Sequence, residues 1–293
     1  MKTKCALIGT GLMGTPIAKR LLDHGYELVV WNRTRDKCQP LVQLGANLGG
    51  SIQETVADAH IIITMLTNGA AVTEVLQQGI LPASKPGDIF IDMSSIPPHV
   101  AKQHAQWCRE KGVDALDAPV SGGVVGAEQG SLAIMVGGEK SVFDDALPLF
   151  NVLGRATYVG EAGAGALAKL ANQMIVGMSI AAVAEAMTLM AKAGADAKAV
   201  REAIRGGFAE SRVLELHGQR MVERSFKPGA HATTQLKDLN TALDVARQYG
   251  LDLPVLAKTQ ALFQSMVENG LSDLDHSGLI VEIERLNSIV KNH

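Results

Sequence analysis

Hydrophobic residues follow two different periods along this chain, and the period changes near residue 163. In the first part, short and mostly apolar runs such as Cys5–Ile8, Glu27–Trp31 and Ile61–Met65 alternate with helical patterns. Continuous apolar runs of this length are typical of strands that are buried on both faces of a parallel sheet. After Gly163 the apolar residues recur at helical spacing. The pattern predicts an α/β domain over residues 1–162 and an all-helical domain over residues 163–293.

The same periods predict the remaining elements. The first domain is expected to add strands at Ile89–Asp92, within Asp114–Gly123, and at Ala133–Gly138 and Thr157–Val159, with a helix at Ser141–Val152. The second is expected to hold helices over Leu167–Ala193, Ala197–Gly206, Ser211–Arg220, His231–Tyr249, Pro254–Asn269 and Ser277–Lys291. The run Leu170–Ala191 is long enough for a membrane span, but its Asn172, Gln173 and Glu185 favour a buried helix of a soluble protein.

A glycine motif directly follows the first expected strand. Its residues are Gly9, Thr10, Gly11, Leu12, Met13 and Gly14, and they have the spacing G-x-G-x-x-G between a strand and a helix. The first glycine permits a tight turn, the second lets a pyrophosphate approach the backbone, and the third lets helix and strand pack closely. The N–H groups at the helix start then face the phosphates. A plain glycine turn is the alternative, but this setting predicts a dinucleotide site in a Rossmann-like, doubly wound sheet.

The residues after the second strand bear on the choice of cofactor. An enzyme that uses NAD carries an acidic residue here for the ribose hydroxyls. This chain has Asn32, Arg33 and Thr34 instead, and Asp36 falls at the start of the next helix. A guanidinium group pairs well with a 2′-phosphate, so we expect NADPH to be preferred, with NADH possible. A solvated arginine is the alternative.

Other candidate residues lie at the carboxyl ends of strands, where open α/β sheets bind ligands. We expect Met65 and Leu66 to line the cofactor site, and Ser94 and Ser95 either to contact the nicotinamide ribose or to cap a helix. Ser121, Gly122 and Gly123 form either a structural turn or a nest of N–H groups for a substrate carboxylate.

One lysine near the start of the long helix is the candidate catalyst. Lys169 shares a helix face with Asn172 and Gln173, and a proton donor is expected beside the cofactor. A surface lysine is the ordinary alternative. Lys237 either reaches the cofactor or substrate or pairs with the neighbours of Asp238 on a solvated face, and His276 is better explained by helix capping.

Composition narrows the class of protein. The formal net charge of −3 is unlike that of proteins that bind nucleic acid through a broad basic face. The three cysteines, Cys5, Cys38 and Cys108, have no metal-like spacing and are typical of a reducing compartment. The first strand begins at once, which leaves no room for a signal peptide. We therefore expect a cytoplasmic protein that binds no metal, nucleic acid or membrane.

Together these motifs resemble those of the β-hydroxyacid dehydrogenase family. They appear in the family's order over essentially the whole chain: Gly9-Thr-Gly-Leu-Met-Gly14, Asp117-Ala-Pro-Val-Ser-Gly-Gly123, Gly163-Ala-Gly165 followed by Lys169 and Asn172, and Lys237-Asp-Leu after Phe226-Lys-Pro-Gly229. The chain departs from the family's common pattern at Thr10, Thr67 and Ala230, and the last departure bears on the exact substrate.

The resemblance implies an NAD(P)H-dependent reductase of a small carboxylate-bearing aldehyde, assembled as a homodimer or homotetramer through the C-terminal helices. It implies that Lys169 donates the proton and Asn172 orients the substrate. It also implies that Ser121–Gly123 hold the carboxylate, with Gln173 and Lys237 nearby. The first alternative is another short semialdehyde or glyoxylate reductase or a 3-hydroxyisobutyrate-type dehydrogenase. The others are an imine reductase, against which Lys169 counts, and a non-catalytic dinucleotide-binding module, against which the combined motifs count.

Overall fold

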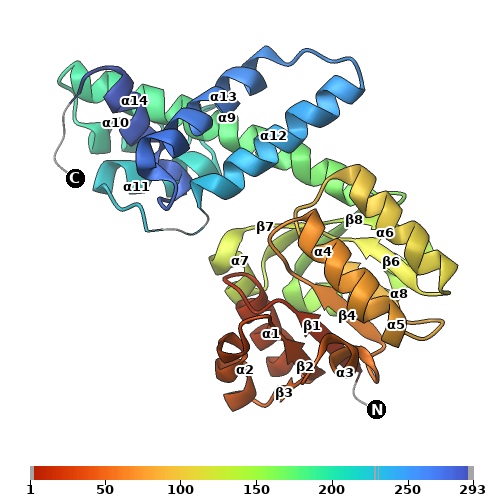
Figure 1. Cartoon of the computed structure of the whole chain (residues 1–293). Helices are drawn as coiled ribbons and strands as arrows, with labels where there is room; N and C mark the ends of the chain where they lie inside the picture. Colours follow the sequence, from red (N-terminus) through yellow and green to blue (C-terminus); the bar gives the residue numbers. More distant parts are fainter. Residues whose placement is uncertain (1–2, 228, 230, 290–293) are drawn as a thin grey trace. The chain divides into compact units, whose positions relative to one another are not determined.

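The computed structural model describes residues 3–227, 229 and 231–289 of the chain (Figure 1). The chain divides into two compact units, Met1–Lys169 and Leu170–His293. Helix α9 (Ala164–Lys192) contributes residues 164–169 to the first unit and its remainder to the second. The boundary expected at residues 162–163 falls just before this helix and stays a prediction.

The first unit is built on a sheet of mostly parallel strands. Its strands are β1 Lys4–Ile8, β2 Glu27–Trp31, β3 Asn47–Leu48, β4 Ile61–Thr64, β5 Ile89–Asp92, β6 Asp114–Asp117, β7 Val120–Ser121, β8 Leu132–Gly138 and β9 Gly154–Gly160. They pair in the order β3-β2-β1-β4-β5-β6-β8-β7, and β9 also pairs with β8. The chain starts in the middle and winds outward in both directions, which confirms the predicted doubly wound α/β fold.

Helices connect these strands and fill the second unit. Those of the first unit are α1 Gly14–Asp23, α2 Gln39–Gln43, α3 Ile52–Val56, α4 Gly69–Val75, α5 Leu81–Ala83, α6 Pro98–Glu110, α7 Gly123–Gln129 and α8 Lys140–Leu153. Those after α9 are α10 Ala197–Ile204, α11 Arg212–Glu223, α12 Ala232–Gln248, α13 Pro254–Met266 and α14 Leu279–Leu286.

The central strands are buried on both faces, as their apolar runs predict. Ile61 and Ile63 of β4 pack in one cluster with Ile17 of α1, whereas Ile62 packs in another with Val72 of α4. Successive side chains of a strand point to opposite faces, so one run supplies both cores. Helices α1 and α8 contribute to the first cluster and α4 and α6 to the second (Figure 1).

Several predicted elements have other bounds in the structure. The strand expected within Asp114–Gly123 is two strands, because after β6 the chain leaves its parallel partner β5 and β7 pairs antiparallel with β8. Helix α9 begins at Ala164, three residues before the predicted Leu167, because Gly163 turns the chain at φ 87° and its carbonyl accepts the Leu167 N–H. The last helix ends at Leu286, and the predicted end, Lys291, lies outside the described residues.

The second unit packs its helices around α9. Ile180 of α9, Leu239 of α12 and Phe263 of α13 belong to one buried cluster. Within the described residues, α9 is long and apolar enough to cross a membrane by length and composition, and 33% of its most apolar window is buried. Ile175 and Leu189 are 66% and 62% exposed. The helix is thus less buried within one chain than the sequence predicts.

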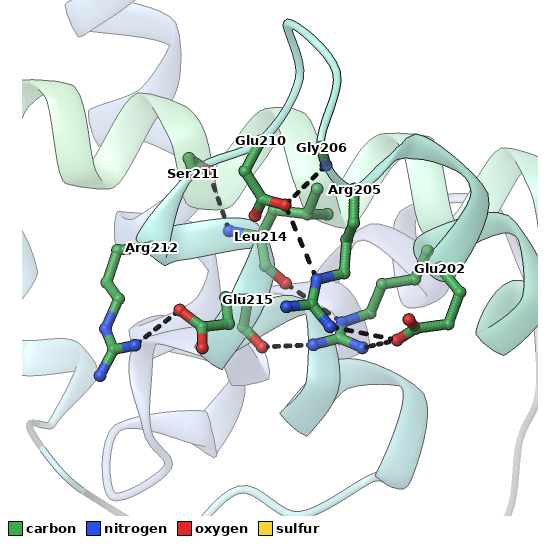
Figure 2. A network of polar contacts seen from close by, with 9 residues as sticks. Glu202, Arg205, Gly206, Glu210, Ser211, Arg212, Leu214 and Glu215 are labelled. Carbon is green, nitrogen blue, oxygen red and sulfur yellow. Dashed lines mark hydrogen bonds and ion pairs between the residues drawn. The ribbon is translucent and has the colours of Figure 1, made fainter.

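Ion pairs and hydrogen bonds hold the connection between α10 and α11 (Figure 2). The Glu210 carboxylate accepts the Gly206 N–H at 2.9 Å and lies 3.7 Å from the Arg205 guanidinium, which also pairs with Glu202. Phe208 lies in this connection and is fully exposed. The loop is therefore held in shape by its own side chains.

Candidate active site

The glycine loop between β1 and α1 has little room for side chains except at its middle glycine. A Cβ atom on Gly9, which has φ 105°, would lie 2.3 Å from the Met65 carbonyl oxygen. One on Gly14 would lie 1.9 Å from the Gly9 carbonyl oxygen, whereas one on Gly11 would meet nothing within 4 Å. The outer glycines thus serve close packing, and the middle one leaves the backbone open. This geometry fits a dinucleotide pyrophosphate.

Two polar side chains in the loop after β2 differ in their contacts: Asn32 is hydrogen-bonded, and Arg33 is exposed. The Asn32 Oδ1 atom accepts the Thr10 N–H at 3.2 Å, and its Nδ2 group donates to the Thr34 carbonyl at 2.9 Å. Asn32 therefore ties its loop to the glycine loop. Arg33 is exposed and forms no ion pair with the described residues, so its guanidinium is available for a cofactor phosphate.

A buried carboxylate organises the loops after β4 and β5. The Asp92 Oδ1 atom accepts the Thr64 hydroxyl at 2.8 Å and the Ser94 N–H at 3.0 Å. The Ser94 hydroxyl accepts the Leu66 N–H at 2.9 Å, so Ser94 joins the two loops from inside. Ser95 is half-buried beside it. Met65 and Thr67 lie in the first loop, where Thr67 is exposed.

A small cavity lies behind these loops. The cavity has a volume of about 10 Å³, and its lining residues include Asp92, His104 and Asp117. Among the described residues, Asp92 Oδ2 and His104 Nδ1 have no hydrogen-bond partner. Burial raises the pKa of Asp92 to about 6, with Asp117 adding to the shift, and burial lowers the pKa of His104 to about 4. The His104 ring is therefore neutral at pH 7.

The segment expected to hold a carboxylate follows β7. Ser121 is half-buried, and Gly122 and Gly123 are exposed at the start of α7. Their φ angles are 136° and 62°, a conformation that favours glycine. The main chain is therefore uncovered at the position where the sequence predicts an anion site.

Lys169 lies in the second turn of α9 and points to this segment. Its ammonium group donates a hydrogen bond to the Val120 carbonyl at 2.8 Å. Val120 immediately precedes Ser121, so the first unit brings the candidate proton donor and the candidate carboxylate site together.

The other candidate residues belong to the second unit, where they form a polar cluster. The Gln173 amide donates to Gln235 Oε1 at 3.1 Å and to Asp238 Oδ2 at 3.0 Å. Asn172 donates to Gln173 Oε1 at 2.9 Å, and the Lys237 ammonium lies 3.3 Å from Asp238 Oδ1. Gln173 thus has protein partners for its amide, and Lys237 pairs with the buried Asp238 itself. The substrate roles of these residues stay predictions.

A second buried carboxylate holds the end of this unit together. Asp275 accepts hydrogen bonds from the Ser277 hydroxyl at 2.6 Å and the Arg220 guanidinium at 2.6 Å, and lies 3.3 Å from His217 Nδ1. It also accepts the Ser277 N–H, which caps the turn that contains His276. This supports the capping explanation for His276.

Sequence reasoning quoted Asp117 in a motif but missed what it does. Its buried carboxylate accepts the N–H groups of Gly163 and Ala166 at 2.8 and 2.7 Å. Burial raises the pKa of this carboxyl, and these N–H groups lower it. The signal was present in the sequence only as an aspartate at the end of a strand.

Comparison with known proteins agrees with these features. Residues 4–163 match the family described as the NAD binding domain of 6-phosphogluconate dehydrogenase, and residues 163–283 match the NAD-binding family of NADP-dependent 3-hydroxyisobutyrate dehydrogenase. The chain is 44% identical to 2-hydroxy-3-oxopropionate reductase of Escherichia coli (strain K12), over 99% of both chains. The chain belongs to the β-hydroxyacid dehydrogenase family. This confirms the resemblance stated above, and with it an NAD(P)-dependent oxidoreductase that acts on CH–OH groups.

Other members of the β-hydroxyacid dehydrogenase family are similar along most of their length. A probable 3-hydroxyisobutyrate dehydrogenase-like protein of Arabidopsis thaliana is 35% identical over 98% of this chain and 87% of its own. The structure of 3-hydroxyisobutyrate dehydrogenase of Mycobacterium tuberculosis with L-serine superposes with a TM-score of 0.89 at 30% identity, covering 97% of this chain and 99% of that one. The fold is therefore that of the 3-hydroxyisobutyrate dehydrogenases.

Proposed function

We propose that this chain is an NADPH-preferring reductase that converts tartronate semialdehyde (2-hydroxy-3-oxopropionate) to glycerate. The observation that carries the proposal is the 2.8 Å hydrogen bond from Lys169 to Val120, beside Ser121–Gly123. The identity with the Escherichia coli reductase supports this substrate. Ala230, where the chain departs from the family, lies outside the described residues.

The proposed reaction assigns a task to the candidate substrate-binding and catalytic residues. When bound, NADPH supplies the hydride that reduces the carbonyl carbon. Ser121 and the N–H groups of Gly122 and Gly123 hold the substrate carboxylate. The Lys169 ammonium gives its proton to the carbonyl oxygen, and the resulting amine regains a proton from solvent. Asn172, one turn further along α9, orients the substrate.

The cofactor preference rests on the loop after β2. The exposed Arg33 provides a guanidinium for a 2′-phosphate, and no acidic residue occupies positions 32–34. The description of the second matching family as NADP-dependent supports the same preference.

The proposed assembly is a homodimer or homotetramer in the cytoplasm. Ile175 and Leu189 lie on one face of α9 at a spacing of two heptads, and both are largely exposed. A second copy of the chain would remove this apolar face from water.

A substrate panel tests the proposal. NADPH oxidation is measured with tartronate semialdehyde, glyoxylate, succinic semialdehyde, methylmalonate semialdehyde and a cyclic imine. We expect the highest kcat/KM with tartronate semialdehyde. A higher value with another semialdehyde or glyoxylate would assign a different substrate within the family. Turnover of the imine alone would make the chain an imine reductase, and cofactor binding without any turnover would make it a non-catalytic module.

A further inference from the structure

The start of α9 is capped by a side chain from another element. The first N–H groups of a helix have no partner within the helix, and a polar residue at its start usually accepts them. In a capping box, the side chain of the residue just before the helix accepts the backbone N–H of the third helical residue, and the side chain of that third residue accepts the N–H of the residue before the helix. Here Gly163 and Ala166 occupy those positions, and neither has a polar side chain. The Asp117 carboxylate, at the end of β6, accepts both N–H groups, one on each oxygen.

Tight packing gives this carboxylate a single position. Asp117 is 7% exposed. A Cβ atom on Gly165 would lie 2.9 Å from Asp117 Oδ2, and one on Gly137 would lie 2.7 Å from Asp117 Oδ1. Glycines on both sides are therefore what allow the helix start and β8 to close around the aspartate.

The same short segment also holds Lys169. Lys169 follows Ala166 by three residues, so the two lie on one face of the helix. Its ammonium donates to the carbonyl of Val120, three residues after Asp117. The first two turns of α9 are thus attached at two points to residues 117–120, which lead directly into Ser121.

We propose that Asp117 is a positioning residue for Lys169: its carboxylate sets the placement of the first turn of α9 and, through it, of the ammonium group. This inference rests on the proposed function of Lys169. A negative charge at a helix N-terminus also favours the helical turn electrostatically. Without the two accepted N–H groups the turn is free to shift, and displacement of a catalytic group by about 1 Å lowers turnover by a factor of about 10².

The test is a double-mutant cycle on turnover. Asp117→Asn keeps the shape of the side chain but loses the charge and one acceptor oxygen. Each variant is compared by kcat per NADPH-binding site, determined by fluorescence titration, so that unfolded protein is not counted. We expect Asp117→Asn to lower kcat by a factor of about 10–100, with little change in NADPH affinity. In a Lys169→Ala background the same substitution should change kcat less than twofold.

The outcomes separate this inference from the proposed function. If Lys169→Ala alone leaves kcat unchanged, the proposed function fails. If Lys169→Ala lowers kcat but Asp117→Asn costs the same factor in both backgrounds, Asp117 is merely structural and the inference is overturned. Should Asp117→Asn fold poorly, Asp117→Ala in the same cycle, again counted per binding site, decides the matter by the same criterion.

A cap elsewhere in the first unit is the matched control. The Ser51 hydroxyl accepts the Glu54 N–H at 3.1 Å at the start of α3. We expect Ser51→Ala to lower the unfolding midpoint by about 2–4 °C without changing kcat per binding site. A comparable loss of kcat in this variant would show that turnover follows helix capping in general, and would contradict a specific role for Asp117.

Discussion

The Lys169 ammonium and the main-chain carbonyl of Val120 are joined by a hydrogen bond of 2.8 Å. The acceptor is a backbone atom, so the contact does not depend on the side chain at position 120. It gives the long, flexible lysine a defined resting position next to Ser121. A general acid needs such placement within reach of the atom that it protonates.

Cofactor preference is predicted to follow Arg33. Replacing it with aspartate removes the guanidinium that we propose pairs with a 2′-phosphate and adds a charge that would repel this phosphate. We expect Arg33→Asp to weaken NADPH binding by a factor of about 10–100, and NADH binding much less. Dissociation constants for both cofactors from fluorescence titration measure this.

An exposed arginine away from the loop is the control. Arg109, on α6, is 76% exposed at its side chain, and Arg109→Asp changes the net charge by the same amount. The affinity of the Arg109→Asp variant for NADPH and for NADH should equal that of the wild type. Equal loss of NADPH and NADH binding in Arg33→Asp would remove the argument for NADPH.

The first unit is predicted to lose stability as the pH rises through the titration of Asp92. Burial raises its pKa from 3.8 to about 6, so the folded state holds the proton more tightly than the unfolded state. The free energy of unfolding then falls between about pH 4 and pH 6 and stays lower above. Asp92→Asn keeps the acceptor for Thr64 and Ser94 and removes the buried charge. We expect it to be more stable than the wild type by about 1–3 kcal/mol at pH 8.

Urea unfolding at pH 5 and pH 8, followed by tryptophan fluorescence, checks this prediction. Both tryptophans, Trp31 and Trp107, lie in the first unit, so the signal reports on it. Asp144→Asn, which alters an exposed carboxylate, is the control and should leave the pH dependence unchanged. A wild-type stability that rises from pH 5 to pH 8, with Asp92→Asn following it, would contradict the prediction.

Asp275 is predicted to have the opposite pH dependence in the second unit. Burial acts to raise its pKa, but hydrogen bonds from His217 and Ser277 and the charge of His276 outweigh burial and lower it. The ionised carboxylate therefore stabilises the fold above about pH 4, and this contribution is lost as the pH falls further. At pH 7, Asp275→Asn should cost about 3–5 kcal/mol, because it leaves buried partners without their charge.

Thermal unfolding followed by circular dichroism at pH 7 and pH 2 measures this loss. Asp273→Asn, two residues earlier and exposed, should have little effect at either pH. We expect a smaller difference in stability between variant and wild type at pH 2 than at pH 7, because the carboxylate begins to lose its contribution only below about pH 4. The same difference at both pH values would rule this out.

The exposed face of α9 is predicted to be an interface between copies of the chain. Ile175→Glu places a charge on this face and should lower the molecular mass in light scattering. Leu44→Glu alters a side chain that is 52% exposed in the first unit, and should leave the mass unchanged. If Ile175→Glu abolishes binding to phospholipid vesicles and leaves the mass unchanged, the face meets a membrane instead.

Much of the fold could be predicted because it depends on local patterns. The strands Glu27–Trp31 and Ile89–Asp92 have the predicted bounds, since apolar residues make up all of each segment except one charged end residue. Two short elements were not predicted, the strand Asn47–Leu48 and the helix Ile52–Val56. Segments of this length are too short to display a hydrophobic period.

The site was predictable only where a motif carries it. The glycine loop could be interpreted because each glycine answers a local steric need. Asp117 accepts a hydrogen bond from the main-chain N–H of Gly163, 46 residues further along the chain. Every non-proline residue has such an N–H group, so the sequence contains no pattern that reveals this contact. The partner of Gln173, Gln235, is 62 residues away, and nothing in the sequence joins the two.

The most direct measurement is the kcat for tartronate semialdehyde of Lys169→Arg and Lys169→Ala. Arginine keeps the positive charge but holds its proton too tightly to donate it near neutral pH. Lys192→Ala, at the exposed far end of the same helix, is the control and should behave as the wild type. The account predicts that both Lys169 variants lose a factor of about 10²–10⁴ in kcat while their NADPH affinity stays near that of the wild type. A kcat that is unchanged in Lys169→Ala would contradict it.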